Sequence, residues 1–181
     1  MQWLRQGFNH VSSTLRQTSP RSTFLGVLYV INASCACHLF VEYVGAIQHV
    51  AGPSMLPTMA ESGEVVIENR LSVRLNPRKF RRGDLVTYES PLEPGRRVCK
   101  RILGLPGDIV CVDPTGMKAP STEHTVVPTG HIWAIGDNAA MSRDSRDYGP
   151  VSMSLIRGTL WARLYPFSRM TIFKNNMSYI D

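Results

Sequence analysis

Residues 98–103, Val98-Cys99-Lys100-Arg101-Ile102-Leu103, decide what kind of fold this chain is expected to adopt. Their apolar and β-branched content is typical of a β-strand, in which alternate side chains share one face of a sheet. Lys100 then lies on the same face as Val98 and Ile102, which is the apolar one. Because burial disfavours an ammonium ion, we expect the pKa of Lys100 to fall from about 10.4 toward about 7 to 8.

Other short runs after residue 51 predict further strands. The clearest are residues 64–67 (EVVI), 84–88 (DLVTY) and 108–112 (DIVCV), which Gly, Pro and Asp punctuate. Ten of the 12 prolines fall between residues 52 and 150 and leave little room for long helices. The sequence therefore predicts a mostly β fold, with one compact domain over residues 52–181 and no internal repeat.

The composition limits the classes of function. A chain of 181 residues, 43% of them hydrophobic and 19% charged, fits one domain with an appendage. The net charge of +6 is not arranged as a basic stripe among aromatic residues, so we expect no nucleic acid partner. The four cysteines lack metal-ligand spacing and are expected to be buried thiols, with a disulfide as the alternative. No cofactor or metal is expected.

The N-terminal part has a different composition. Residues 1–23 are rich in Arg, Ser, Thr and Gln, and no acidic residue precedes Glu42. This is typical of a mitochondrial targeting segment, and it also fits a basic flank that orients a membrane anchor. Residues 24–41 contain no Asp, Glu, Lys or Arg, so we expect a single membrane-anchor helix over residues 24–44. A helix that lies on the membrane or is buried in protein is the alternative.

The predicted anchor has a consequence for the rest of the chain. If the helix spans a bilayer, the arginines before it keep the N-terminus on the matrix or cytoplasmic side, and the remainder lies on the opposite side. Ser54 follows Val41 by 13 positions, which corresponds to about 20 Å of helix or at most about 45 Å of extended chain. Chemistry at Ser54 is then expected close to the membrane surface.

The stretch Gly52-Pro53-Ser54-Met55-Leu56-Pro57-Thr58 supplies a candidate nucleophile. A serine hydroxyl needs a general base to remove its proton, and a neutral lysine is a known base for this purpose. Gly52 lets a substrate backbone come close, and the two prolines stiffen the loop. Ser54 and Lys100 are therefore predicted to act as a catalytic pair.

Each of these residues also has an ordinary explanation when it is taken alone. A serine in a proline-flanked turn commonly bonds only to its own backbone. Lys100 is equally explained by reaching water, or by pairing with an acid such as Glu89 or Asp108. The catalytic interpretation therefore depends on the two residues occurring together with a third motif.

That third motif is residues 136–150 (GDNAAMSRDSRDYGP), a segment dense in turn residues and in alternating charges. By itself it would be an ordinary solvated loop. A buried neutral lysine needs an orienting partner, however, and the hydroxyl of Ser142 donates or accepts a hydrogen bond without adding charge. Asp144 and Arg146 are expected to brace the loop as an ion pair.

Together these residues resemble the type I signal peptidases. The resemblance covers residues 52 to about 166, and its four motifs occur in the order found in that family. They are residues 54–58 (SMLPT), 82–86 (RGDLV), 100–108 (KRILGLPGD), and 136–138 (GDN) followed by Ser142, Asp144, Ser145 and Arg146. The resemblance implies a compact signal-peptidase-like β domain behind a single N-terminal membrane-anchor helix.

The resemblance also implies a mechanism. Ser54 attacks the scissile carbonyl and forms an acyl-enzyme. Lys100 is the general base for this attack and for the water that later releases the product. Ser142 orients the lysine amine, and Asp144 and Arg146 match positions that shape the site.

Two departures from the family pattern change these expectations. Some bacterial relatives have, at the position of Gly52, a serine whose hydroxyl helps to bind the oxyanion. Pro53 has no N–H, so the backbone N–H of Ser54 is the donor that remains. Only 27 residues lie between Asp108 and Gly136, which is too few for the large extra domain of some bacterial enzymes, so a small cap is expected.

Within the family, the acid-free N-terminus, the single anchor and the form of the Ser54 motif resemble the catalytic subunits of the mitochondrial inner membrane protease. The stretches Cys99-Lys100-Arg101 and Val112-Asp113-Pro114 look like the first of these subunits. This implies an inner-membrane protein whose catalytic domain faces the intermembrane space. It also implies a heterodimer with a related second subunit, and precursor polypeptides as substrates.

Three alternatives compete with this interpretation. A bacterial-type export signal peptidase has the same chemistry in a plasma membrane, so location distinguishes it. A non-catalytic partner subunit has the same fold and tolerates loss of Ser54 or Lys100, which the intact motifs disfavour. A self-cleaving repressor of related fold needs a DNA-binding domain where this chain has an apolar segment, and it is rejected.

Overall fold

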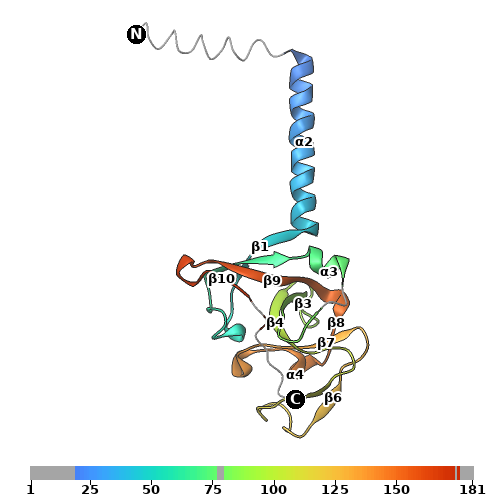
Figure 1. The fold of residues 1–181 in the computed structure, drawn as a ribbon, viewed down its shortest axis with the longest axis vertical. Helices are drawn as coiled ribbons and strands as arrows, with labels where there is room; N and C mark the ends of the chain where they lie inside the picture. Colours follow the sequence, from blue (N-terminus) through green and yellow to red (C-terminus); the bar gives the residue numbers. More distant parts are fainter. Residues whose placement is uncertain (1–18, 77–79, 174, 176–181) are drawn as a thin grey trace. The chain divides into compact units, whose positions relative to one another are not determined.

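The structure is a computed structural model that describes residues 19–76, 80–173 and 175 (Figure 1). Residues 1–18, which are most of the predicted targeting segment, lie outside the described residues. The chain divides into two units, residues 1–41 and residues 42–181. The second unit contains all the residues that the sequence analysis proposed for the site.

Helix α2, Pro20–Tyr43, provides the described part of the first unit. Its most apolar window has a mean hydropathy of 1.9 and none of its residues is buried, so by length and composition it is able to cross a membrane. The helix begins before residue 24 because Ser19 caps it, accepting a hydrogen bond from the Ser22 N–H at 3.2 Å, and because proline suits the first helical position. The membrane-anchor role of this helix remains a prediction.

The second unit is built mainly from strands. Their bounds are β1 Gly45–Val50, β2 Glu64–Asn69, β3 Leu85–Glu89, β4 Arg97–Gly104, β5 Ile109–Cys111, β6 His124–Val126, β7 His131–Ile135, β8 Val151–Ser152, β9 Ile156–Tyr165 and β10 Thr171–Ile172. The helices are short: α3 Leu71–Leu75 and α4 Ser145–Tyr148, with 3-10 turns η1 Pro53–Met55, η2 Ala139–Met141, η3 Met153–Leu155 and η4 Phe167–Arg169. The mostly β fold class is confirmed.

Eight of these strands form one sheet in the order β1-β2-β9-β3-β4-β7-β8, with β10 paired to β9 (Figure 1). The neighbouring strands pair antiparallel, and β3 and β4 lie near the middle of the order. In the β3–β4 register, Lys100 stands opposite Val86, whose side chain is fully buried. Opposite residues share a face, so the register puts Lys100 on a core face, as its strand pattern predicted.

Apolar side chains pack in two clusters, and successive residues of β3 belong to different ones. One cluster comprises Val73, Phe80, Val86, Tyr88, Ile102, Ile132, Ala134, Val151 and Ile156. The other comprises Met55, Met59, Val66, Leu85 and Leu160. Because adjacent strand residues point to opposite faces, the central strands are covered on both sides, which gives the site residues a rigid base.

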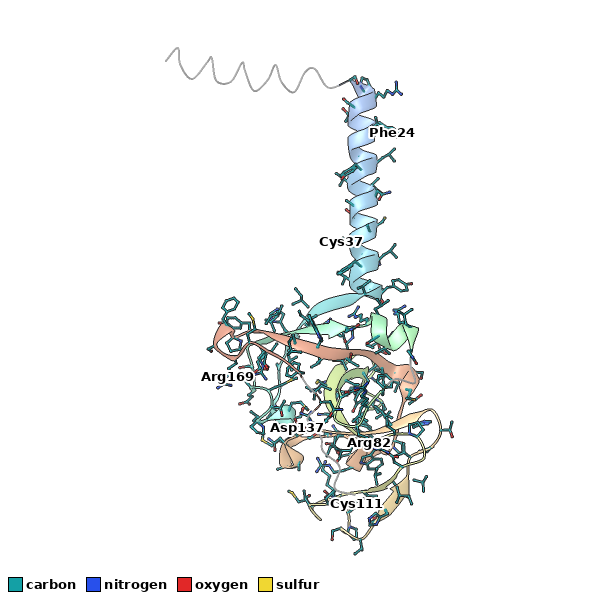
Figure 2. The ribbon with its side chains drawn as sticks, in the orientation of Figure 1. Phe24, Cys37, Arg82, Cys111, Asp137 and Arg169 are labelled. Atoms are coloured by element: carbon teal, nitrogen blue, oxygen red, sulfur yellow. The ribbon has the colours of Figure 1, made fainter. Side chains whose placement is uncertain are left out.

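The segment between Asp108 and Gly136 adds only a small second sheet, in which β5 pairs with β6, before strand β7. Cys111, labelled in Figure 2, marks this hairpin at the end of the β domain. The turn between β5 and β6 is held by Asp113, which is fully buried. The expected small cap is therefore a two-stranded hairpin and its turn.

Candidate active site

The loop that carries Ser54 is shaped by its glycine and proline. Gly52 has φ of 122°, in the region that L side chains rarely adopt, and its N–H donates to the Glu61 carbonyl at 2.7 Å. Pro53 opens the 3-10 turn η1, and Met55 is only 2% exposed because it packs in the core. Ser54 is partly buried, and its N–H, at the second position of the turn, has no partner within the turn.

A second loop, residues 136–138, holds the backbone of the first. The N–H of Asn138 donates to the Ser54 carbonyl at 3.0 Å, and its side-chain amide donates to the Pro53 carbonyl at 3.1 Å. Glycine is required at position 136, because a Cβ there would overlap the Ser142 hydroxyl and the Ser54 carbonyl oxygen. The Ser54 and Ser142 loops therefore meet at Gly136.

Lys100 lies in the middle of β4 and is only 3% exposed. The acids considered as alternative partners are engaged elsewhere: Glu89 pairs with Arg157 and Asp108 pairs with Arg82. Among the described residues, no carboxylate lies within ion-pair distance of the Lys100 amine. Burial lowers the pKa of Lys100 below its ordinary value, against the opposing negative charge of Asp144.

Ser54 and Lys100 line the same cleft, which has a volume of about 310 Å³. Its walls also include Val98, Met141 and Tyr148. A larger hollow of about 980 Å³ contains neither Ser54 nor Lys100, so size alone does not identify the site. The smaller cleft is the one that brings a hydroxyl and a buried amine to a common surface, and it is the candidate active site.

Ser142 belongs to a buried network centred on Asp144. The Ser142 hydroxyl donates to Asp144 Oδ2 at 2.5 Å, and the N–H of Gly136 donates to the same oxygen at 2.9 Å. The Arg146 guanidinium donates to both Asp144 oxygens, at 2.9 and 2.8 Å. The structure therefore contains the ion pair that the sequence predicted between Asp144 and Arg146.

The predicted hydrogen bond between Ser142 and the Lys100 amine is not among the hydrogen bonds of the described residues. The Ser142 hydroxyl donates its hydrogen bond to Asp144, so its oxygen lone pairs remain able to accept from an amine. The orienting role of Ser142 stays a prediction. Gly52, Ser54, Lys100 and their supporting residues likewise stay candidates whose chemistry is untested.

Asp144 is held ionised although it is fully buried. Burial would raise its pKa, but hydrogen bonds from Arg146, Gly136 and Ser142 outweigh burial and lower the pKa below the ordinary carboxyl value. A depressed folded-state pKa means that this stabilisation is present above the ordinary carboxyl pKa and is lost as the pH falls through the folded value. Asp144 therefore presents a permanent negative charge toward Lys100 at neutral pH.

Replacing Arg146 by methionine is expected to destabilise the fold by about 3 to 5 kcal/mol, because a buried carboxylate would lose its cation. Arg146 also lies 3.6 Å from Asp113, so two buried acids share this guanidinium. The measurement is the free energy of unfolding of the full chain in detergent. The matched control is Arg157→Met, whose exposed pair with Glu89 contributes at most about 1 kcal/mol. Equal losses of unfolding free energy in Arg146→Met and Arg157→Met would contradict the role of Arg146 as the cation that stabilises the buried Asp144.

The thiol of Cys99 also lines the cleft. Burial raises the pKa of Cys99 to about 12, so the residue is a thiol at neutral pH and does not compete as a nucleophile. All four cysteines are free, but the expectation that they are buried is wrong for Cys35 and Cys37, which are exposed on α2, and Cys111 is only partly buried. Among the described residues, no group of three His, Cys, Asp or Glu side chains is placed to hold a metal ion.

Two supporting interactions were not assigned from sequence. Arg101, the neighbour of Lys100, forms a two-point pair with Asp137 at 2.8 and 2.6 Å and also donates to the Gly83 carbonyl. Asp137 is labelled in Figure 2. Asn138 ties down the nucleophile loop. Asp137 and Asn138 belong to the 136–138 motif. The signal in the sequence was a carboxylate and an amide side chain directly after a glycine.

A mostly β domain whose cleft contains an accessible serine and a buried lysine defines a candidate serine hydrolase. The family model of "Signal peptidase, peptidase S26" matches residues 24–118 and 113–165. The chain therefore belongs to the signal peptidase family, the S26 peptidases.

Individual relatives agree with this family. The chain is similar to "Mitochondrial inner membrane protease subunit 1" of Schizosaccharomyces pombe, with 42% identity over 137 residues, 76% of this chain and 84% of the relative. It is also similar to "Mitochondrial inner membrane protease subunit 2" of Danio rerio, with 37% identity over 133 residues, 71% of this chain and 69% of the relative. A crystal structure of a signal peptidase I from Enterococcus faecalis has 25% identity and a TM-score of 0.37, covering 46% of this chain and 97% of the other.

Proposed function

We propose that the chain is a membrane-bound serine endopeptidase that removes N-terminal sorting sequences from proteins delivered to the mitochondrial intermembrane space. The observation that carries the proposal is the cleft shared by Ser54 and Lys100, where the lysine is 3% exposed. An amine that is buried without an acid partner is poised to be neutral, and a neutral amine is a base. Membership of a peptidase family and the names of the relatives supply the reaction class.

The first half of the proposed reaction acylates the enzyme. The Ser54 hydroxyl attacks the scissile carbonyl carbon while its proton passes to the neutral Lys100 amine. The Ser54 N–H stabilises the developing oxyanion, an interaction worth about 3 to 4 kcal/mol per donor in other hydrolases. When the tetrahedral intermediate collapses, the C–N bond breaks and the ammonium of Lys100 gives its proton to the leaving amine.

The second half releases the product. Lys100, neutral again, takes a proton from a water molecule as the water oxygen attacks the ester carbonyl. The ester bond to Ser54 breaks, Ser54 regains a proton through Lys100, and a new carboxylate leaves. Throughout the cycle Ser142 holds the amine with an oxygen lone pair, and Asp144 holds Ser142, at 2.5 Å between their oxygens.

The proposal includes a location and a partner. Residues 1–23 serve as the targeting segment, residues 24–44 as the membrane anchor and residues 52–181 as the peptidase domain facing the intermembrane space. Support comes from the hydropathy of α2 and from relatives named as inner membrane proteases. Because relatives carry the names of subunits 1 and 2, we propose a related second subunit as partner in a heterodimer.

The proposal predicts a defined cleavage. Purified full chain, alone and with a candidate second subunit, is incubated with a precursor that carries an intermembrane-space sorting sequence. We expect one new N-terminus, identified by mass spectrometry, and no such product from the Ser54→Ala protein. The location is tested by fractionating mitochondria and by measuring whether the β domain is protected from added protease.

Two results would favour the alternatives. If the assembly cleaves normally with Ser54→Ala in this chain, the chain is a non-catalytic subunit and the catalyst lies elsewhere. If the protein fractionates with a plasma membrane and cleaves export signals, the bacterial-type interpretation replaces the mitochondrial one.

A further inference from the structure

Lys118 belongs to the turn between β5 and β6, which a buried carboxylate organises. Asp113 is fully buried. Its Oδ1 accepts from the Thr115 hydroxyl at 2.7 Å and from the Thr115 N–H at 3.1 Å, and its Oδ2 accepts from the Lys118 N–H at 2.7 Å. The backbone of Lys118 is therefore fixed by this turn.

From this fixed backbone the Lys118 side chain reaches across to the Ser142 loop. Its ammonium donates to the backbone carbonyl of Ser142 at 2.7 Å and to Asp147 Oδ2 at 2.6 Å. The same Asp147 oxygen accepts from the Asp144 N–H at 2.9 Å and completes the capping box of α4. The Lys118 ammonium thus links the Ser142 carbonyl to Asp147, the acid at the third position of helix α4.

A second link joins the same two segments. Arg146, whose side chain is 1% exposed, lies 3.6 Å from Asp113 and donates to Asp144 at 2.8 Å. Both links converge on Ser142 and Asp144, the groups expected to face the Lys100 amine. The Lys118 side chain is only partly exposed, at 25%, and does not line the cleft.

We propose that Lys118 is a positioning residue for the active site, and that its contacts with the Ser142 carbonyl and Asp147 hold Ser142 and Asp144 at the correct distance from Lys100. The inference rests on the proposed function of the Ser54 and Lys100 pair. Lys118 acts through Ser142 and touches no reacting atom. The hairpin between residues 109 and 126 then serves as a brace for the catalytic loop.

The charges around Lys100 predict how the loss of Lys118 changes the pH dependence of activity. The negative charge of Asp144 favours the ammonium form of Lys100, whereas the positive charges of Arg146 and Arg96 oppose it. Removing the Lys118 cation makes the surroundings of Lys100 more negative, and a looser loop admits water. Both effects raise the pKa of Lys100, so the rise of activity with pH moves to higher pH.

The test compares Lys118→Met with Lys118→Arg in the full chain, assembled as for the precursor assay. For Lys118→Met we expect kcat to fall about tenfold with KM within about twofold, since misplacing a group near the reaction costs rate rather than binding. The rising limb of the pH profile is expected to move up by about 0.5 unit. Lys118→Arg keeps the positive charge and the hydrogen-bond donors, so it should restore the wild-type pH profile and most of kcat.

The control is Arg157→Met, which removes a cation from an exposed pair on β9. It should leave kcat and the pH profile at wild-type values. If Lys118→Met does not fold, as judged by thermal unfolding, Lys118→Gln replaces it with the same expectations. Wild-type kcat and an unmoved pH limb in the folded variant would overturn the inference, even with a lowered melting temperature. Because the wild type is cleaving in the same assay, that outcome leaves the proposed function intact.

Discussion

Replacing Ser54 by alanine is expected to lower kcat for precursor cleavage by at least about a thousandfold, because the acyl-enzyme has no oxygen on which to form. The substitution removes one atom from a residue of a 3-10 turn whose backbone is tied by Asn138. The fold and the cleft should therefore persist. The measurement is single-turnover cleavage of the precursor, followed by the amount of new N-terminus.

The matched control for this prediction is Ser62→Ala, a serine in the exposed loop before β2. The kcat and the melting temperature of the Ser62→Ala protein should equal those of the wild type. A trapped acyl-enzyme offers a second readout: a slow ester substrate should add its acyl mass to wild-type protein and not to Ser54→Ala. Acylation of the alanine variant, or cleavage at more than a small fraction of the wild-type rate, would refute the role of Ser54.

Replacing Lys100 by methionine is expected to lower kcat by about 10² to 10⁴-fold, the usual range for loss of a general base. Methionine preserves the length and the apolar stem of a side chain that is 3% exposed, so the change removes the amine with little change in packing. Because the two residues act as a unit, the double variant Ser54→Ala/Lys100→Met should be no slower than Ser54→Ala alone. A multiplicative loss would show that they act independently.

The pH dependence supplies the second half of this prediction. Below the pKa of Lys100 the amine is protonated and cannot accept the Ser54 proton, so kcat/KM should rise with pH through that pKa. Burial lowers this pKa below the ordinary lysine value, and the rise should therefore come below about pH 10.4. The residual activity of Lys100→Met should lack the rise. A wild-type profile that climbs only near the ordinary lysine value would contradict the buried base.

The local part of the site was accessible from the sequence. The strand pattern around Lys100 predicted its apolar face, and the structure has the residue opposite Val86 in the β3–β4 register. The loop around Ser54 was predictable because Gly52 permits a backbone conformation that other residues rarely adopt, whereas Pro53 and Pro57 restrict their own backbones. The Asp144 and Arg146 pair was also expected, since the two residues are close in sequence and of opposite charge. Helix α2 begins at Pro20, four residues ahead of the uncharged segment, because Ser19 caps it.

Contacts between distant segments were not accessible in the same way. The hydrogen bonds of Asn138 to the Ser54 loop, the Arg101 pair with Asp137, and the reach of Lys118 to Ser142 depend on which turns meet after the sheet has formed. Nothing in the sequence singles out Lys118 among the four lysines of the chain. A side chain with several flexible bonds has many acceptors within reach in an unfolded chain, and only the folded backbone selects among them.

By itself, therefore, the sequence determined the elements whose conformation each residue imposes locally: the strands, the glycine and proline loop of Ser54, the apolar N-terminal helix and the face on which Lys100 lies. The tertiary structure decided which polar groups neutralise one another. Antiparallel pairing and the β5–β6 hairpin bring Asp113, Lys118, Ser142, Asp144 and Arg146 into one network, although they are spread over more than 30 positions. The physical reason is that burial makes an unpaired charge costly, so the partners are chosen by three-dimensional proximity and not by position along the chain.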